Sequence, residues 1–269
     1  MASESSDIIN SLATIRDYIR WASSRFTEAG LFFGHGTDNA LDEACYLVLH
    51  TLHQPYHLSR DYFDAALTEG ERLALFNIIT RRIDKKIPAA YLTHEAIFAG
   101  LSFYVDERVL IPRSPIAELI EAHFSPWVDS ERVKNVLDLC TGSGCIAIAC
   151  AYAFPDAQID ALDFSREALE VAALNRERHH LQEQVSLVHS DLFSGLPEKK
   201  YAIIVSNPPY VARAEWQQLP TEYFAEPEMG FDGGEDGLDL VIRILAQAEK
   251  YLCNHGILVV EVGSSAETL

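Results

Sequence analysis

The sequence "VLDLCTGSGCIAIA", residues 136–149, is the clearest indication of the fold. It begins as an aliphatic strand, turns through a loop that holds Gly142 and Gly144, and continues into small apolar residues suited to a buried helix. Two glycines allow a tight turn and let a ligand approach the backbone closely. Taken alone, the pattern also fits the G-x-G-x-x-A fingerprint of dinucleotide-binding proteins. The stretch therefore predicts a strand, a ligand-binding loop and a helix, in that order.

The sequence downstream continues this alternation of strand and helix. From Val133 onward, apolar strand-like runs alternate with segments of helical periodicity. Strands are expected at residues 133–140, 157–163, 185–191, 201–207 and 256–263, and helices at 145–154, 166–180 and 238–252. The pattern predicts an α/β fold, in which a parallel sheet has helices on both faces and binds ligands at the carboxyl ends of its strands.

The sequence upstream has a different character. Residues 7–86 carry apolar residues at three- and four-residue spacings, which predicts helices with a break near Gly70. The basic run at 81–86 could contact RNA, but the solvated end of a helix is the favoured interpretation. Residues 87–115 alternate and are interrupted at Gly100, which predicts a hairpin. The expected domains are a helical N-terminal substrate-recognition domain (1–86), a β-hairpin linker (87–115) and a C-terminal domain (116–269).

The composition of the 269-residue chain limits the classes of protein to consider. Hydrophobic residues make up 48%, enough for a sizeable core, and no apolar run approaches the ~18 residues that span a bilayer. The N-terminus lacks the basic and apolar regions of a signal peptide. Five cysteines without a C-x-x-C pair indicate neither a disulfide framework nor a zinc site. We expect a soluble, cytoplasmic protein without a metal.

The formal net charge of −19 narrows the choice of partners. A strongly acidic surface repels the phosphate backbone of nucleic acids and attracts basic proteins, so neither DNA nor a membrane is expected as a partner. The acidity can equally serve solubility. The same alternatives apply to the acid-rich segment 222–239. It is either a hydrated loop or a rim that attracts a basic protein substrate.

Three acidic residues end successive predicted strands: Asp138, Asp163 and Asp191. Asp138 lies just before the loop formed by Thr141, Gly142, Ser143 and Gly144. A carboxylate there suits a cationic sulfonium ligand with an ammonium group better than a pyrophosphate. Asp163 could bind ribose hydroxyls, and Asp191 could accept from an adenine amino group. The ordered set favours S-adenosyl-L-methionine, and a nicotinamide dinucleotide remains the alternative.

The motif "NPPY", residues 207–210, follows the fourth predicted strand. The nitrogen of an amide or an aromatic amine attacks a methyl group poorly, because its lone pair is delocalised. The side-chain oxygen of Asn207 and the carbonyl of Pro208 can accept from both N–H protons of such a nitrogen. Pro208 and Pro209 fix φ, so that this carbonyl is aimed in advance. Tyr210 offers an aromatic face that can pack on a planar substrate group and exclude water.

The Asn-Pro-Pro-Tyr motif and the glycine loop together resemble the methyltransferases of planar nitrogens. The hairpin "AGLSFYVDERVLIPR" (99–113) and the helical N-terminal region make the chain similar to the HemK-like protein-(glutamine-N5) methyltransferases over nearly its whole length. "PRSPIAELI" (112–120) and residues 219–239 resemble the branch that acts on the third large-subunit ribosomal protein. The release-factor branch usually carries Pro-Arg-Pro-Glu-Thr instead.

This resemblance implies a Rossmann-like class I methyltransferase fold and S-adenosyl-L-methionine as cofactor. It implies that Asp138, Thr141, Gly142, Ser143 and Gly144 line the methionine side of the cofactor, with Asp163 at the ribose, Asp191 at the adenine and Asn207 between cofactor and substrate. Asn207, Pro208, Pro209 and Tyr210 would hold the glutamine amide, and Arg113 and Phe103 would approach the cofactor. In this family an antiparallel C-terminal hairpin usually follows, and its strands are expected to be missing here.

The resemblance implies N5-methylation of a glutamine in a basic large-subunit ribosomal protein. The same chemistry on a peptide chain release factor is the first alternative. An adenine-N6 DNA methyltransferase is the second, which the net charge of −19 disfavours. A cofactor-binding protein without turnover and a nicotinamide-dependent oxidoreductase are the remaining alternatives. The intact Asn-Pro-Pro-Tyr motif argues against both.

Overall fold

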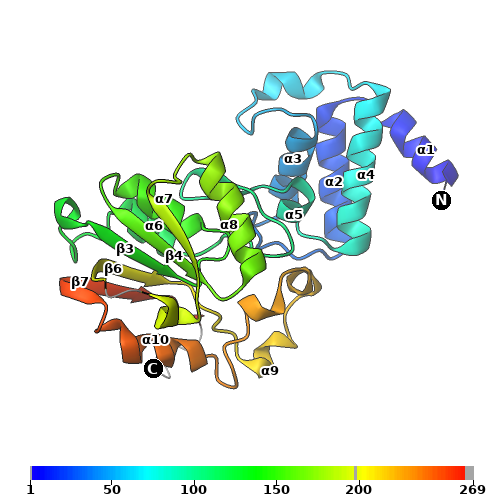
Figure 1. Cartoon of the computed structure of the whole chain (residues 1–269). Helices are drawn as coiled ribbons and strands as arrows, with labels where there is room; N and C mark the ends of the chain where they lie inside the picture. The colour runs from blue at the N-terminus through cyan, green and yellow to red at the C-terminus, as the bar shows by residue number, and fades with distance from the viewer. Residues whose placement is uncertain (1, 197–198, 264–269) are drawn as a thin grey trace. The chain divides into compact units, whose positions relative to one another are not determined.

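The computed structural model describes residues 2–196 and 199–263. The chain divides into two compact units (Figure 1). The first comprises Met1–His94 and Pro220–Ala225, and the second comprises Glu95–Leu219 and Glu226–Leu269. The chain therefore returns to the first unit for six residues, shortly after the Asn-Pro-Pro-Tyr motif. Among the described residues, no helix combines the length and the hydrophobicity needed to cross a bilayer.

The second unit is built on a parallel sheet of five strands, ordered β5-β4-β3-β6-β7. The predicted α/β fold is thereby confirmed. The order changes direction between β3 and β6, and such a switch point is where sheets of this kind bind ligands. The strands are β3 (Asn135–Leu139), β4 (Gln158–Asp163), β5 (Val185–His189), β6 (Tyr201–Ser206) and β7 (Leu252–Val260).

Helices cover both faces of this sheet (Figure 1). Alternate residues of a strand point to opposite faces, so Val136 packs in the core beneath α7 while Leu137 packs in the core beneath α10. Nearly every residue of α7 is buried, which its small side chains permit. The helices of this unit are α6 (Ile116–Glu121), α7 (Cys145–Ala153), α8 (Arg166–Arg178), α9 (Arg213–Trp216) and α10 (Asp239–Ala248), with single 3-10 turns η2 (Ser130–Arg132), η3 (Leu192–Gly195) and η5 (Glu228–Gly230).

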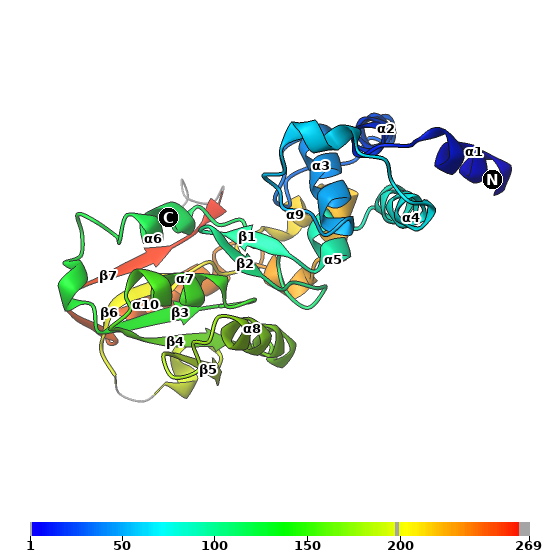
Figure 2. The ribbon, with the colours of Figure 1, turned by 90° about the horizontal axis from the view of Figure 1, so that it is seen from above.

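A short hairpin begins the second unit (Figure 2). Strands β1 (Ala96–Phe98) and β2 (Leu101–Phe103) pair antiparallel across a two-residue turn. Both turn residues, Ala99 (φ 46°) and Gly100 (φ 73°), are left-handed, as a type I′ hairpin turn requires. The predicted hairpin is present, but no strand forms between residues 104 and 115.

The first unit is helical: α1 (Ala2–Ser11), α2 (Ile15–Glu28), α3 (Ala40–Thr51), η1 (Arg60–Asp64), α4 (Glu69–Lys85) and α5 (Ala89–Thr93), with η4 (Thr221–Ala225) in the returning segment. Asn39 caps α3, because its side chain accepts from two backbone N–H groups. The break expected near Gly70 lies earlier. Thr68 and Glu71 form a capping box that starts α4, which places Gly70 in its first turn.

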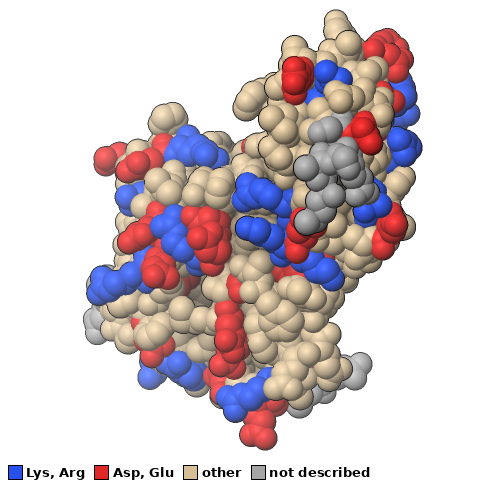
Figure 3. All heavy atoms as spheres, turned by 90° about the vertical axis from the view of Figure 1, so that its right-hand side faces the viewer, with Lys and Arg blue, Asp and Glu red and all other residues tan. Residues whose placement is uncertain are grey.

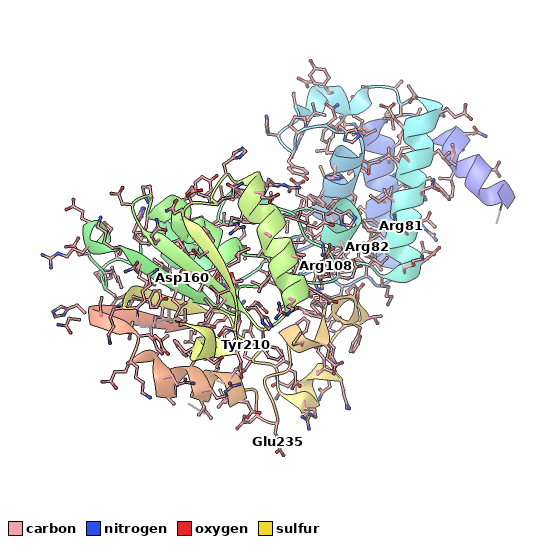
Figure 4. All side chains as sticks on the ribbon, in the orientation of Figure 1. Arg81, Arg82, Arg108, Asp160, Tyr210 and Glu235 are labelled. Carbon is pink, nitrogen blue, oxygen red and sulfur yellow. The ribbon has the colours of Figure 1, made fainter. Side chains whose placement is uncertain are left out.

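The basic run at 81–86 is not simply a solvated helix end. Arg82 is fully buried, whereas its neighbour Arg81 is exposed on the same helix (Figure 4). The Arg82 guanidinium lies 2.7 Å from Glu43 and 3.3 Å from Glu222, and it donates to the Phe32 carbonyl at 2.9 Å. The returning segment is therefore held within the first unit by buried charges.

Candidate active site

The sheet brings the two sequence motifs to one place. Leu139 at the end of β3 pairs with Ser206 at the end of β6, and the Ser206 hydroxyl donates to the Leu139 carbonyl at 2.9 Å. The glycine loop leaves the sheet directly after Leu139, and Asn207 directly follows Ser206. Both motifs thus emerge side by side at the switch point, where the sequence places the ligand.

The glycine loop is shaped to receive a ligand. Gly142 (φ 54°) and Gly144 (φ 80°) both adopt left-handed backbone conformations. A Cβ built on Gly142 would meet no atom within 4 Å, so space remains open above this residue. A Cβ on Gly144 would lie 3.2 Å from the Ala172 side chain, so Gly144 permits close packing of α8. The two glycines therefore serve different purposes, ligand approach and helix packing.

Asp138 is a fully buried carboxylate. Its Oδ2 accepts from the Thr141 hydroxyl at 2.5 Å and from the Ala147 N–H at 3.1 Å. Its Oδ1 is also buried and has no hydrogen-bond partner among the described residues. Burial raises the pKa of Asp138 to about 7. A buried acceptor without a donor is the signature of a site that a cationic or donor group completes.

Asp163 ends β4 and braces the glycine loop. Its Oδ2 accepts from the Gly142 N–H, and its Oδ1 accepts from the Ser165 N–H, both at 2.8 Å. The side chain is partly buried, and this burial raises its pKa. The predicted ribose contact of Asp163 stays a prediction. The structure adds a second role, because the carboxylate fixes the loop residue that faces the open space.

Asp191 follows β5 and is half exposed. It forms an ion pair with Arg243 on α10. One guanidinium nitrogen, Nη2, donates to both carboxylate oxygens, at 2.7 and 2.8 Å. Its predicted contact with adenine stays a prediction. The sequence reasoning missed a nearby apolar surface: Phe164, directly after Asp163, is 62% exposed and stacks on His189. The sequence could have indicated this surface, because Phe164 directly follows the acid that ends a predicted strand.

The Asn-Pro-Pro-Tyr corner is accessible. Pro208 is buried, whereas Asn207, Pro209 and Tyr210 are each partly exposed. Figure 4 shows Tyr210 beyond the ends of the strands. The backbone of the following residue, Val211, is also held in place, because its N–H donates to the Phe231 carbonyl at 2.8 Å. The corner is thus rigid, lies beside the glycine loop and leaves its amide side chain reachable.

A residue that the sequence reasoning missed contacts this corner. The Tyr210 hydroxyl donates to Glu261 at 2.6 Å, and the Ser114 hydroxyl donates to the other oxygen of the same carboxylate at 2.5 Å. Glu261 follows β7, the strand next to β6. Its position was visible in "VVEVG" as an acid at the end of a predicted strand. In the sheet, two strands separate β7 from β4, the strand that ends in Asp163. The sequence therefore contained no sign that Glu261 belongs with the other acids at strand ends.

Phe103 and Arg113, which were expected to approach the cofactor, have other partners in this structure. Phe103 is fully buried in the core beneath α7, against Phe98 and His179. Arg113 pairs with the buried Glu226 through two hydrogen bonds of 2.8 and 2.9 Å. Phe103 is therefore held by core packing and Arg113 by an ion pair, and their approach to the cofactor stays a prediction.

The predicted acidic rim loses two of its members. Glu222 and Glu226 are both buried and paired with arginine, so neither contributes to an exposed surface. The exposed acids of this segment are Glu228, Asp232, Glu235, Asp236 and Asp239. On the face drawn in Figure 3, acidic and basic side chains are interspersed. Glu222 is buried in the first unit, and Glu226 is buried in the second.

Comparison with known proteins agrees with the geometry. A family model described as "Methyltransferase small domain" matches residues 122–227. The ribosomal protein uL3 glutamine methyltransferase of Neisseria meningitidis serogroup A is 54% identical over 259 residues, covering 96% of this chain and 85% of the relative. The enzyme of the same name from Xanthomonas campestris pv. campestris is 54% identical over 258 residues, covering 96% and 83%.

Among solved structures, the human methyltransferase 10 domain containing protein is 22% identical, the match covers 56% of this chain and 66% of that chain, and the TM-score is 0.40. The two bacterial relatives, by contrast, match 96% of this chain. At their identity and coverage, the chain belongs to the ribosomal protein uL3 glutamine methyltransferase family.

Proposed function

We propose that this protein uses S-adenosyl-L-methionine to methylate a glutamine side-chain nitrogen (N5) in ribosomal protein uL3. One observation carries the proposal: the Asn-Pro-Pro-Tyr corner lies beside a glycine loop whose buried Asp138 has an acceptor without a donor. A corner that holds an amide and a loop that receives a cation are the two halves of such a reaction. The names of the 54% identical relatives supply the substrate.

The residues present fit the cofactor. Asp138 Oδ1 would accept from the ammonium group of the cofactor. Among the described residues, it is the only buried carboxylate oxygen without a hydrogen-bond partner. The open space above Gly142 would receive the methionine part, with Thr141 and Ser143 beside it. Asp163 would hold the ribose, and Asp191 and the exposed ring of Phe164 would adjoin the adenine. When bound, the cofactor supplies an electrophilic methyl group on a positively charged sulfur.

The corner acts on the glutamine amide. Asn207 Oδ1 and the Pro208 carbonyl accept from its two N–H groups, which favours a pyramidal nitrogen with an available lone pair. The fixed φ of Pro208 and Pro209 holds these acceptors in place before the substrate arrives. Tyr210 packs beside the amide and excludes water. No residue must remove a proton first, because the N–H becomes acidic only as the nitrogen gains the methyl group, and the proton then leaves to solvent.

Charge and compartment support the same substrate. With a net charge of −19, the protein is suited to a basic protein rather than to DNA. The five cysteines are free, as in a reducing compartment, and we place the reaction in the cytoplasm, where we expect a newly made ribosomal protein to be available. A peptide chain release factor offers the same amide and is the substrate to compare.

Transfer of a labelled methyl group tests the proposal directly. The protein is incubated with labelled S-adenosyl-L-methionine and, in parallel, with uL3, a release factor and an adenine-containing DNA duplex. We expect label on one glutamine of uL3, located by mass spectrometry, and no label on the DNA. Label on the release factor alone would assign the same chemistry to the other substrate. Label on none of the three would refute the proposal.

A further inference from the structure

The hydroxyl of Tyr210 is bound at the far side of the Asn-Pro-Pro-Tyr corner. It donates to Glu261 Oε1 at 2.6 Å, an ordinary distance for a hydroxyl that donates to a carboxylate. A hydroxyl that donates to a carboxylate makes a charge-assisted bond, about twice as strong as one between neutral groups. The two prolines restrict the backbone of the corner, but they do not restrict the side-chain torsions of Tyr210. This bond therefore selects one orientation of the ring.

The carboxylate of Glu261 is itself held in place. Its Oε2 accepts from the hydroxyl of Ser114, a buried residue, at 2.5 Å. The Ser114 oxygen in turn accepts from the N–H of Ile116, which lies at the start of α6. The N–H of Glu261 donates to the Ser206 carbonyl at 3.0 Å, one residue before Asn207. Side chain and backbone of Glu261 are thus fixed from three directions.

The ring of Tyr210 also rests on a glycine just beyond Glu261. A Cβ built on Gly263 would lie 2.6 and 2.7 Å from two ring carbons, closer than real contacts allow. Gly263 has φ 52°, a conformation that side chains rarely adopt. The segment 261–263 therefore contacts the tyrosine at two points, the hydroxyl and the ring carbons Cδ2 and Cε2.

We infer that Glu261 is a positioning residue for methyl transfer, which acts by holding the Tyr210 ring beside the substrate amide. The inference rests on the proposed function. Both carboxylate oxygens already accept from Tyr210 and Ser114, so Glu261 is not placed to take a proton from the substrate. Its contribution passes through Tyr210 alone. Ser114 supports it from the opposite side.

A double-mutant cycle tests this route. The variants are Glu261→Gln, Tyr210→Phe and both together, with Glu249→Gln as a control that removes one exposed carboxylate of the same unit. Turnover and KM with uL3 are measured with the dissociation constant of S-adenosyl-L-methionine and the melting temperature. We expect each single variant to lower kcat about tenfold, the loss of one charge-assisted bond, with unchanged cofactor affinity. The control keeps wild-type values.

The double variant decides the mechanism. If Glu261 acts through Tyr210, the double variant loses no more activity than either single one. A further tenfold loss from Glu261→Gln in the Tyr210→Phe background, or no loss in either single variant, would overturn the inference. If Glu261→Gln fails to fold, Tyr210→Phe still decides, since full activity without the hydroxyl contradicts the role. A wild-type protein that methylates nothing would refute the proposed function instead.

Discussion

Among single residues, Asp138 is buried at a cost to the free energy of folding, because one of its carboxylate oxygens has no hydrogen-bond donor among the described residues. Water would satisfy both of its oxygens, but folding buries the carboxylate and leaves one oxygen without a donor. Burial of an acid favours its neutral form, which is why its pKa rises to about 7. A cationic ligand reverses this preference. The residue therefore predicts a coupling between pH and cofactor binding.

We expect the affinity for S-adenosyl-L-methionine to fall as the pH drops below about 7. The pKa of Asp138 in the free protein is raised to about 7, and a bound cation favours the ionised form, so binding must release a proton below that pH. Each pH unit below 7 should weaken binding up to about tenfold. Calorimetric titration at pH 6 and pH 8 measures this. Asp138→Asn should bind weakly at both, and a wild-type affinity that ignores pH would contradict the assignment.

At the scale of elements, one asparagine joins three segments of the second unit. Asn175 on α8 is fully buried. It accepts from the Tyr104 N–H at 2.7 Å and donates to the Tyr104 carbonyl at 3.0 Å and to the Ser143 carbonyl at 2.9 Å. The chain after the hairpin, the helix and the glycine loop are thus linked by one side chain. The loop owes its shape to α8 as well as to its own glycines.

Asn175→Ala should lower the free energy of unfolding by about 2–4 kcal/mol, because it leaves buried backbone groups of Tyr104 and Ser143 without partners. Cofactor binding should weaken as well, since the Ser143 carbonyl loses its donor. Denaturant unfolding and a cofactor titration check both effects. Asn135→Ala removes a half-exposed asparagine of β3 that donates to one carbonyl, and it should cost less. Equal losses from the two variants would count against the linking role.

Local patterns predicted the elements, whereas long-range partners decided the rest. The five strands and α7, α8 and α10 follow from runs such as "YAIIVS" and from the glycine loop. Asn175 was hidden within a helix that reads as charged and exposed. Arg82 was misread because its burial depends on Glu43 and Glu222, which are 39 and 140 residues away in sequence. Glu261 escaped for the same reason, since it meets Tyr210 only after the sheet has formed.

At the scale of the whole molecule, the chain makes an unusual return. Segment 220–225 lies between residues of the second unit but belongs to the first. Glu222 anchors it there, accepting from the Phe32 N–H at 3.0 Å and from Arg82. Burial raises the pKa of Glu43, the other partner of this arginine. Segment 220–225 begins ten residues after the end of the Asn-Pro-Pro-Tyr motif.

Arg82→Met should destabilise the first unit by about 3–5 kcal/mol, because it leaves two buried carboxylates without their cation. It should also release segment 220–225, which hydrogen exchange at the Phe32 amide would report. Arg81→Met is the matched control, since it removes an exposed arginine from the same helix turn and should change stability by less than about 0.5 kcal/mol. Similar losses from both variants would show that the buried charges do not anchor the segment.

Asn207 is the residue most directly responsible for holding the substrate amide in the proposed reaction. Removing one aimed acceptor from an active site costs about 2.7–4 kcal/mol of barrier, roughly 100- to 1000-fold in rate. The decisive measurement is therefore the single-turnover rate of methyl transfer to uL3 by Asn207→Ala, taken alongside its dissociation constant for S-adenosyl-L-methionine. We predict a rate loss of that size with cofactor affinity within about threefold of wild type. An unchanged rate, or a loss explained entirely by weaker cofactor binding, would contradict the amide-holding corner.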